Sequence, residues 1–369
     1  MPRKIKISYI IDDLSIAGAQ VHLVRLVKGL HPEFDIEIIS LDSISDRLAL
    51  QLPQDVKLKR FQMDSVRSHY FFISFFQLIS HLRKRKPDIV HTYLNTSNVF
   101  GLLAARFSGI KKKIISRRDM GIFQTSRMAK IEALLSRYMA QKVFCVCEAA
   151  AKDINKFNYI SESKIVIIFN GVDTKIFTPK KFYTTNDKVR FGVVATMNRI
   201  EKGHFDFLKA AYLLTYKHHQ KAEFWLVGDG PLRQKLEEMT MELNLMENVK
   251  FLGLQTNLKP ILKKLDVLVV PSYSEGISNA ALEGMAVGLP IIATAVDGNI
   301  ELIDPETTGL LVSPKNPESL ANAFLKYIMK NELIKKHGMN ARGRVEKLFT
   351  IETMIRAYRE EYYKLITGS

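Results

Sequence analysis

Two glutamates, Glu275 and Glu283, enclose a run of small and apolar residues in the segment SEGISNAALE. Their separation of eight residues turns the two side chains about 80° apart around an α-helix, so a single helix face suits the pair badly. Ser278 or Asn279 suits a helix N-cap, and the alanines that follow are good helix formers. We therefore expect Glu275 in the loop before a helix and Glu283 in the second turn of that helix.

The start of this helix is suited to an anion. Gly276 lets the backbone approach a ligand closely, and the free N–H groups of Gly276, Ile277, Ser278 and Asn279 lie at the helix start. The positive end of the helix favours a phosphate group there. The segment therefore predicts a phosphate-binding loop.

Two cations occur in a second loop, where Arg199 and Lys202 follow the apolar stretch 189–195. An arginine fork and a lysine point charge between a strand and a helix would clamp a diphosphate. An ordinary pair of surface charges is the alternative interpretation.

Further polar or small residues follow other apolar stretches. Gly18 lies in the turn IAGAQ, which either presents free N–H groups to an anion or is only a tight turn. Gly228 begins the turn GDGP, and Arg117 and Arg118 follow another stretch. His91, in PDIVHTYL, is either a polar group directed at a ligand or a hydrogen-bonded structural histidine.

The elements that position these loops alternate along the chain. Strands are expected near 4–11, 35–41, 56–61, 88–92, 112–117, 142–147, 164–168, 189–195, 222–228, 249–252, 266–271, 289–294 and 309–312. Helices are expected near 18–30, 70–86, 202–217, 230–243, 316–330 and 350–366. Such alternation is typical of parallel sheets with helices on both faces. Because the pattern occurs twice, it predicts an α/β fold of two Rossmann-like doubly wound domains that face each other across a cleft, with ligands at the carboxyl ends of the strands.

The expected boundaries divide the 369 residues into four parts. A Rossmann-like domain occupies 1–170, and a linker with turn signals occupies 171–188. A second Rossmann-like domain occupies 189–350. The C-terminal helix, 351–369, either closes the second domain or crosses back to the N-terminal domain.

The composition, 47% apolar and 25% charged, is that of an ordinary globular protein. No stretch reaches the ~18–20 apolar residues of a membrane span. The two cysteines, Cys145 and Cys147, alternate along a strand and cannot readily pair, and no cleavable leader is apparent. These features predict reduced thiols and a cytoplasmic protein.

The net charge of +16 is concentrated in the first half, where residues 1–175 carry 28 Lys and Arg and 16 Asp and Glu, and the remainder carries a net +4. A basic half predicts an anionic partner: a membrane surface, a phosphorylated acceptor or nucleic acid. The segment 69–86 joins several phenylalanines to four consecutive cations, so it is either a core helix or a helix that contacts an anionic membrane.

The motifs together resemble the retaining glycosyltransferases of family 4, which have the GT-B fold. The resemblance covers almost the whole chain. PSYSEGISNAALEGMAVGLPIIATAVDGNIELI is similar to the family's E-x7-E segment, and RIEKGH, VGDGPLR and NGVDTKIFTP are similar to its donor loop, glycine loop and domain junction. IAGAQ and PDIVHTYL are similar to its N-terminal motifs. Where many members carry an arginine five residues before the lysine, this chain has Met197.

The resemblance implies a role for each candidate residue. Lys202 and Arg199 would hold the donor diphosphate together with the amides after Gly276. Glu283 would bind the ribose. Glu275 would contact the donor sugar near its reacting carbon, and His91 would face that sugar from the first domain. Glu275, Lys202 and His91 are thus the expected catalytic residues. The donor-binding set further includes Gly18, Gly228, Leu254, Ile277, Ser278 and Asn279.

These expectations describe an enzyme that moves a sugar from a nucleoside-diphosphate sugar to a glycan or lipid-linked acceptor, with retention, in cell-surface polysaccharide or lipopolysaccharide biosynthesis. No metal or other cofactor is expected, because Lys202, Arg199 and a helix N-terminus would stabilise the leaving diphosphate. The expected location is the cytoplasm or the inner face of the cytoplasmic membrane, and no nucleic acid is expected as a partner. A sugar-nucleotide epimerase of the same fold and a nucleic-acid-binding protein are the alternatives.

Overall fold

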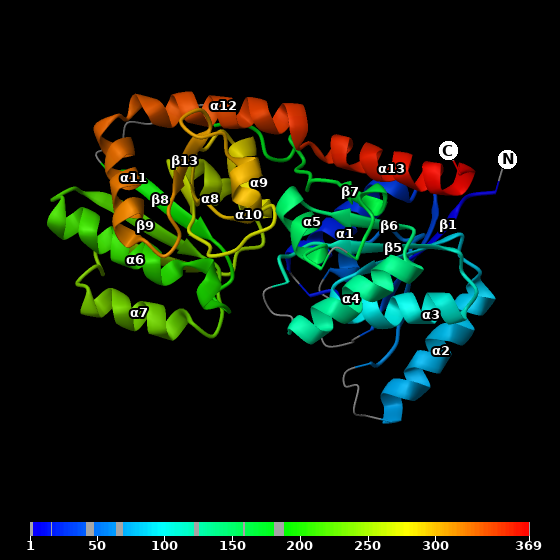
Figure 1. Ribbon diagram of the computed structural model, residues 1–369. Helices are drawn as coiled ribbons and strands as arrows, with labels where there is room; N and C mark the ends of the chain where they lie inside the picture. The colour runs from blue at the N-terminus through cyan, green and yellow to red at the C-terminus, as the bar shows by residue number, and fades with distance from the viewer. Residues whose placement is uncertain are drawn as a thin grey trace. The chain divides into compact units, whose positions relative to one another are not determined.

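The computed structural model describes residues 3–15, 17–41, 48–63, 69–121, 125–157, 159–180 and 188–368. Ile16 of the expected N-terminal turn and residues 181–187 of the expected linker lie outside these ranges. The chain divides into two compact units, and each consists of a sheet with helices around it (Figure 1). The first unit contains Met1–Asn170 and Ile351–Ser369, and the second contains Gly171–Thr350.

The first unit is built on a seven-stranded sheet in the order β3-β2-β1-β4-β5-β6-β7. Every pairing in it is parallel. Its strands are β1 (Lys6–Ile11), β2 (Asp35–Ser40), β3 (Lys57–Arg60), β4 (Ile89–Tyr93), β5 (Lys112–Arg117), β6 (Lys142–Cys145) and β7 (Ile165–Ile167). The central strands β1, β4 and β5 are buried on both faces because helices cover both faces of a parallel sheet.

Two helix layers bury this sheet. Its helices are α1 (Gly18–Leu30), α2 (His69–Arg85), α3 (Leu102–Phe107), α4 (Ser126–Met139), α5 (Glu148–Ile154) and α13 (Ile351–Thr367). On one side α1 and α13 pack together, and Tyr358 and Tyr362 of α13 enter the core. On the other side α2 packs on α3. The last helix of the chain is therefore a core element of the first unit.

The second unit has a six-stranded parallel sheet in the order β10-β9-β8-β11-β12-β13. Its strands are β8 (Val189–Val194), β9 (Ala222–Val227), β10 (Val249–Gly253), β11 (Val267–Val270), β12 (Ile291–Thr294) and β13 (Gly309–Val312). Its helices are α6 (His204–Tyr212), α7 (Arg233–Glu242), α8 (Lys259–Lys264), α9 (Asn279–Ala286), α10 (Asp297–Leu302), α11 (Pro317–Met329) and α12 (Glu332–Leu348). One helix layer contains α6, α7 and α11, and α9 packs with α8 and α12.

All the strands expected from the sequence are present within one or two residues of their expected positions. Both sheets are doubly wound, so the expected fold class is confirmed. The helix expected over 202–217 differs. It is preceded by a 3₁₀ turn, Ile200–Lys202, and it ends in a π-turn, Leu213–Lys217. The division occurs because Gly203 takes the left-handed conformation, with φ 74°, which ends the 3₁₀ turn before α6 begins.

Candidate active site

The candidate site of the second unit lies where the strand order of its sheet reverses. The neighbours β8 and β11 connect to opposite halves of the sheet. Doubly wound sheets bind ligands at the carboxyl ends of such strands. The loop after β8 carries Arg199 and Lys202, and the loop after β11 carries Glu275.

The structure brings Lys202 and Glu275 together. The Lys202 Nζ donates to Glu275 Oε2 at 2.8 Å, and the Ser272 hydroxyl donates to the same oxygen at 3.1 Å. The Lys202 side chain is 29% exposed and that of Glu275 is 16% exposed. A half-buried pair of this kind is well positioned and still open to a ligand.

The two loops are fixed to each other by their backbones. The Tyr273 N–H donates to the Glu201 carbonyl at 2.7 Å. A Cβ on Gly203 would lie 1.9 Å from the Pro271 carbonyl oxygen, so only glycine permits this approach at a positive φ. The backbone on both sides of Lys202 is therefore held in place by contacts of its neighbours Glu201 and Gly203.

The backbone of Glu275 is held on both sides by the start of α10. Its N–H donates to Asp297 Oδ2 at 3.2 Å, and its carbonyl accepts from the Gly298 N–H at 3.0 Å. The Ser274 hydroxyl donates to the same Asp297 oxygen at 2.6 Å. Asp297 has a φ of 40°, which is unfavourable for a residue with a Cβ and which occurs preferentially at functional positions.

Asp297 was missed in the sequence. The signal that could have found it is the dipeptide Asp297-Gly298, a turn signature at the start of a helix.

The glutamate pair lies as its spacing predicts. Ser278 is the N-cap of α9, and its hydroxyl accepts from the Ala281 N–H at 3.3 Å. Glu275 is therefore in the loop, and Glu283 is in the second turn of the helix, where its side chain is buried.

The remaining residues of the phosphate loop differ in exposure. Gly276 and Ile277 are buried, whereas Ser278 and Asn279 are half-buried. The N–H groups that begin α9 thus belong to a loop with a packed start and a more accessible end.

The glycine loop after β9 packs against the backbone after β8. A Cβ on Gly228 would lie 2.0 Å from the Ala195 carbonyl oxygen. The Met197 N–H donates to the Asp229 carbonyl at 2.8 Å, and the Met197 side chain is buried in the core. The residue in place of the family's arginine therefore contributes to packing, which leaves the exposed Arg199 as the other cation of this loop.

Leu254 follows β10 next to the glycine loop. The Gly228 N–H donates to the Gly253 carbonyl at 2.9 Å, and the Leu254 side chain is 50% exposed. An exposed apolar side chain at a carboxyl strand end is suited to stacking against a planar base.

In the first unit, His91 lies in the core and not at the surface. Its ring is fully buried in β4. Its Nδ1 is bonded to the Tyr362 hydroxyl at 2.7 Å and its Nε2 to the Ser116 hydroxyl at 2.8 Å. Burial lowers the pKa of His91 well below its ordinary value. Both ring nitrogens are hydrogen-bonded inside the core, which favours the alternative of a structural histidine, and the role opposite the sugar stays a prediction.

Gly18 is the first residue of α1 and is exposed. In the loop after β1, the Asp13 carboxylate accepts from the Ser15 N–H at 2.7 Å and from the Gln20 side chain of α1 at 3.0 Å. Asp13 therefore joins the carboxyl end of β1 to the first turn of α1.

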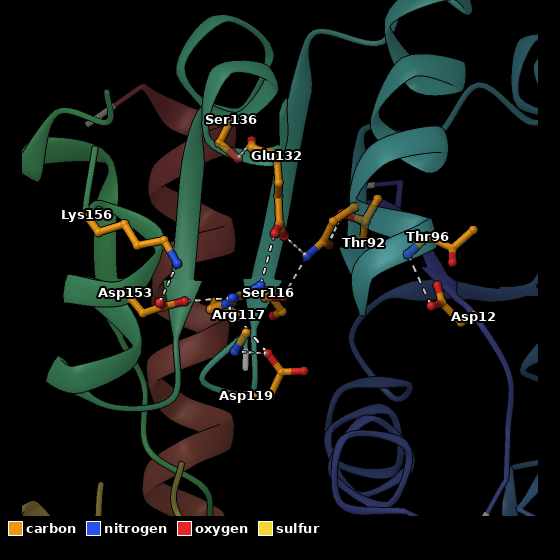
Figure 2. Close-up of polar contacts among 12 residues, drawn as sticks. Asp12, Thr92, Thr96, Ser116, Arg117, Asp119, Glu132, Ser136, Asp153 and Lys156 are labelled. Atoms are coloured by element: carbon orange, nitrogen blue, oxygen red, sulfur yellow. Dashed lines mark hydrogen bonds and ion pairs between the residues drawn. The ribbon is translucent and has the colours of Figure 1, made fainter. Parts of the chain in front are cut away.

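A buried polar network lies at the carboxyl ends of β4 and β5 (Figure 2). Arg117 bridges Glu132 of α4 at 3.0 Å and Asp153 of α5 at 2.7 Å. The Asn98 amide donates to Glu132 at 2.8 Å, and Thr92 donates to Asn98 at 2.8 Å. Arg117 is thus a structural cation that joins α4 and α5 to the sheet.

Two known protein families match the chain. The sequence profile of the family described as "Glycosyltransferase Family 4" matches residues 16–176, and that described as "Glycosyl transferases group 1" matches residues 188–330. Together they cover every strand of the two sheets except β1. The chain belongs to the GT-B glycosyltransferases.

Relatives of this glycosyltransferase match it over nearly their whole length. The UDP-Gal:alpha-D-GlcNAc-diphosphoundecaprenol alpha-1,3-galactosyltransferase of Escherichia coli is 26% identical, over 99% of this chain and 98% of the relative. A Campylobacter jejuni GalNAc-alpha-(1->4)-GalNAc-alpha-(1->3)-diNAcBac-PP-undecaprenol alpha-1,4-N-acetyl-D-galactosaminyltransferase is also 26% identical, over 98% of each chain.

A solved structure of similar fold is Anabaena HepE in complex with UDP-glucose. It has a TM-score of 0.83 at 17% identity and covers 97% of this chain and 99% of its own. TarM has a TM-score of 0.82 at 13% identity, over 99% of each chain. At these identities the likeness establishes the fold of the glycosyltransferase.

None of the helices in the described part of the chain is long and apolar enough to cross a membrane. Among the same residues, no cluster of three or more His, Cys, Asp or Glu side chains could hold a metal ion.

Proposed function

We propose that this glycosyltransferase moves a sugar from a nucleoside-diphosphate sugar to a lipid-linked acceptor, with retention at the anomeric carbon. The observation that carries the proposal is the contact between Lys202 and Glu275 at the strand reversal of the second sheet. Two relatives whose names specify undecaprenol-linked acceptors, and HepE, solved with UDP-glucose, support these substrate classes.

The proposed chemistry exchanges one bond at the anomeric carbon for another. The bond to the diphosphate oxygen breaks, a bond to the acceptor hydroxyl oxygen forms, and the hydroxyl proton passes to the departing phosphate. Negative charge builds on the diphosphate. Lys202, Arg199 and the N–H groups at the start of α9 would stabilise that charge.

The other site residues would orient the donor. Glu275, between Lys202 and the Asp297 turn, would hold sugar hydroxyls close to the reacting carbon. Glu283 would bind the ribose, and Leu254 would pack on the base. Because cations and amides neutralise the leaving group, we propose that the reaction needs no metal, and turnover is expected to persist in excess EDTA.

We propose that the enzyme acts at the cytoplasmic face of a membrane, because a lipid-linked acceptor is held in the bilayer. Its product would be a cell-surface polysaccharide or a lipopolysaccharide. Family membership favours transfer over the epimerase and nucleic-acid alternatives of the sequence.

Thermal unfolding with a panel of nucleoside diphosphates and their sugars tests the donor proposal. A donor at about 100 times its Kd should add about 2.7 kcal/mol to the free energy of unfolding. The stabilising donor is then incubated with and without undecaprenol-linked saccharides. Acceptor-dependent release of nucleoside diphosphate is expected, whereas conversion of the donor alone to an epimer would overturn the proposal.

A further inference from the structure

Helix α2 has an apolar side that the core does not cover. Leu78 and Leu82 are fully buried. Phe72, Ile73 and Phe76 are 56%, 49% and 66% exposed, and their spacing of one and four residues places them on one side of the helix. We call Phe72, Ile73 and Phe76 the outer α2 face. Large apolar side chains exposed next to one another mark a surface that meets a partner or a membrane.

Phe107, the last residue of α3, extends this surface. It is 57% exposed. Its ring lies 6.5 Å from that of Phe75, and its carbonyl accepts from Arg83 Nη2 at 3.0 Å. The aromatic surface therefore continues to the cationic end of α2.

A basic cavity opens at that end, before β4 and β5. Its volume is about 680 Å³, and Arg83, Lys86, Lys111 and Lys112 contribute to its lining. We call it the basic cavity. The acidic residue of its lining, Asp88, forms an ion pair of 2.6 Å with Arg3.

Asp88 has a cationic partner, but three of the cations that line the basic cavity have no carboxylate partner among the described residues. In the described part of the chain, no ion pair joins Arg83, Lys86 or Lys111 to a carboxylate. The Lys112 Nζ donates to the Ile366 carbonyl at 3.1 Å. A cavity with this excess of positive charge is suited to a phosphate group.

The basic cavity lies at the amino ends of β4 and β5, the edge of the sheet opposite to the one at which doubly wound folds bind substrates. It is therefore not part of the catalytic site, and its ligand needs a separate explanation.

We propose that the outer α2 face, Phe107 and the basic cavity dock the enzyme on an anionic phospholipid bilayer, with a headgroup phosphate in the cavity. The inference rests on the proposed function, because a lipid-linked acceptor requires the enzyme at a membrane. Lysine is depleted in protein–protein interfaces, whereas phenylalanines beside clustered lysine and arginine are typical of a helix lying in a membrane interface. Helix α2 would lie along the bilayer, with its phenylalanines among the acyl chains.

Sedimentation with vesicles tests the docking surface in the full chain. The wild type should bind vesicles of phosphatidylcholine and phosphatidylglycerol in equal parts and should bind pure phosphatidylcholine weakly. The double variant Lys86→Gln/Lys111→Gln should bind the anionic vesicles about thirtyfold more weakly. Phe72→Ser/Phe76→Ser should remove the part of the binding that persists at high salt, since apolar insertion is not screened.

A charge-matched control, Lys28→Gln/Lys209→Gln, removes two exposed lysines elsewhere and should bind the vesicles as the wild type does. Thermal stabilisation by UDP or the donor identified above should be equal in all variants, so failure of the donor proposal is seen separately. Equal vesicle binding by wild type and Lys86→Gln/Lys111→Gln would overturn the inference. So would equal binding of wild type to both kinds of vesicle, or self-association of the chain through this surface in place of vesicle binding.

Discussion

Lys202 Nζ donates a hydrogen bond of 2.8 Å to Glu275 Oε2, across the point where the strand order of the second sheet reverses. The two residues come from loops 73 positions apart in the sequence. Because the carboxylate neutralises the lysine before any ligand binds, an incoming diphosphate has to share or replace this contact.

Removal of either member should severely slow transfer. Lys202→Ala takes away charge opposite the leaving diphosphate, and Glu275→Ala takes away the group that orients the sugar. Each should lower kcat by about 10² to 10³, with the far-ultraviolet circular dichroism unchanged. Lys217→Ala, which breaks an exposed Lys–Glu pair in the same unit, should be as active as wild type. Near-normal turnover of either site variant would refute the assignment.

Asp297 should act on catalysis through the backbone of Glu275. Asp297→Gly removes the acceptor of the Glu275 N–H and also relieves the positive φ. We expect kcat to fall about tenfold while the free energy of unfolding stays the same or rises by about 1 kcal/mol. Asp297→Asn keeps an acceptor oxygen and tolerates the positive φ, so it should retain most of the activity. A Gly variant with wild-type kcat would show that the contact is not needed.

Gly203 should not tolerate a side chain. Gly203→Ala would place a methyl group 1.9 Å from the Pro271 carbonyl oxygen and would force the two loops apart, with a loss of several kcal/mol or a displaced Lys202. Gly343→Ala is the matched control, since a Cβ there meets nothing within 4 Å. It should stabilise α12 by up to about 1 kcal/mol. Thermal unfolding and donor affinity distinguish the two variants.

The second unit should lose stability as the pH falls below neutrality. Burial lowers the pKa of His204 from 6.5 to about 4. Because the unfolded chain takes up this proton first, the stabilisation is complete above about pH 6.5 and is lost as the pH falls towards 4. The loss from this group is about 3 kcal/mol.

His204→Phe should flatten the dependence of the melting temperature on pH in that window. The same change at the exposed His219 controls for the loss of a histidine. An unchanged slope in His204→Phe would contradict the assignment of the proton to this residue.

His91 should contribute to folding and not to chemistry. His91→Phe leaves the Ser116 hydroxyl without its ring partner, which should lower the free energy of unfolding by about 1–3 kcal/mol. The kcat of the folded variant should stay within a few-fold of wild type. A stable variant with a hundredfold lower kcat would restore a catalytic role for His91.

The sequence predicts the framework well because apolar strands and turn residues are local signals. Every expected strand is present, and Ser278 caps α9 as expected. The alternation of strands and helices along the chain then predicts parallel, doubly wound sheets.

Side-chain partners are less predictable because they depend on distant segments. His91 has the same local sequence whether it faces a ligand or a core, and Tyr362, which decides the matter, lies 271 positions away. The hold of Asp297 on Glu275 is likewise a contact between loops, 22 positions apart. The sequence of α2 does not show which of its phenylalanines are exposed, because that depends on where α3 packs against the helix.

The first unit is formed by two separate segments of the chain, and this has a consequence for its folding during synthesis. Tyr358 and Tyr362 fill the core beside β1 and β4, and the Tyr9 and Tyr362 hydroxyls are 3.0 Å apart. A ribosome synthesises α13 only after the whole second unit. The sheet of the first unit is therefore made before the second unit but cannot complete its core until the second unit has been synthesised.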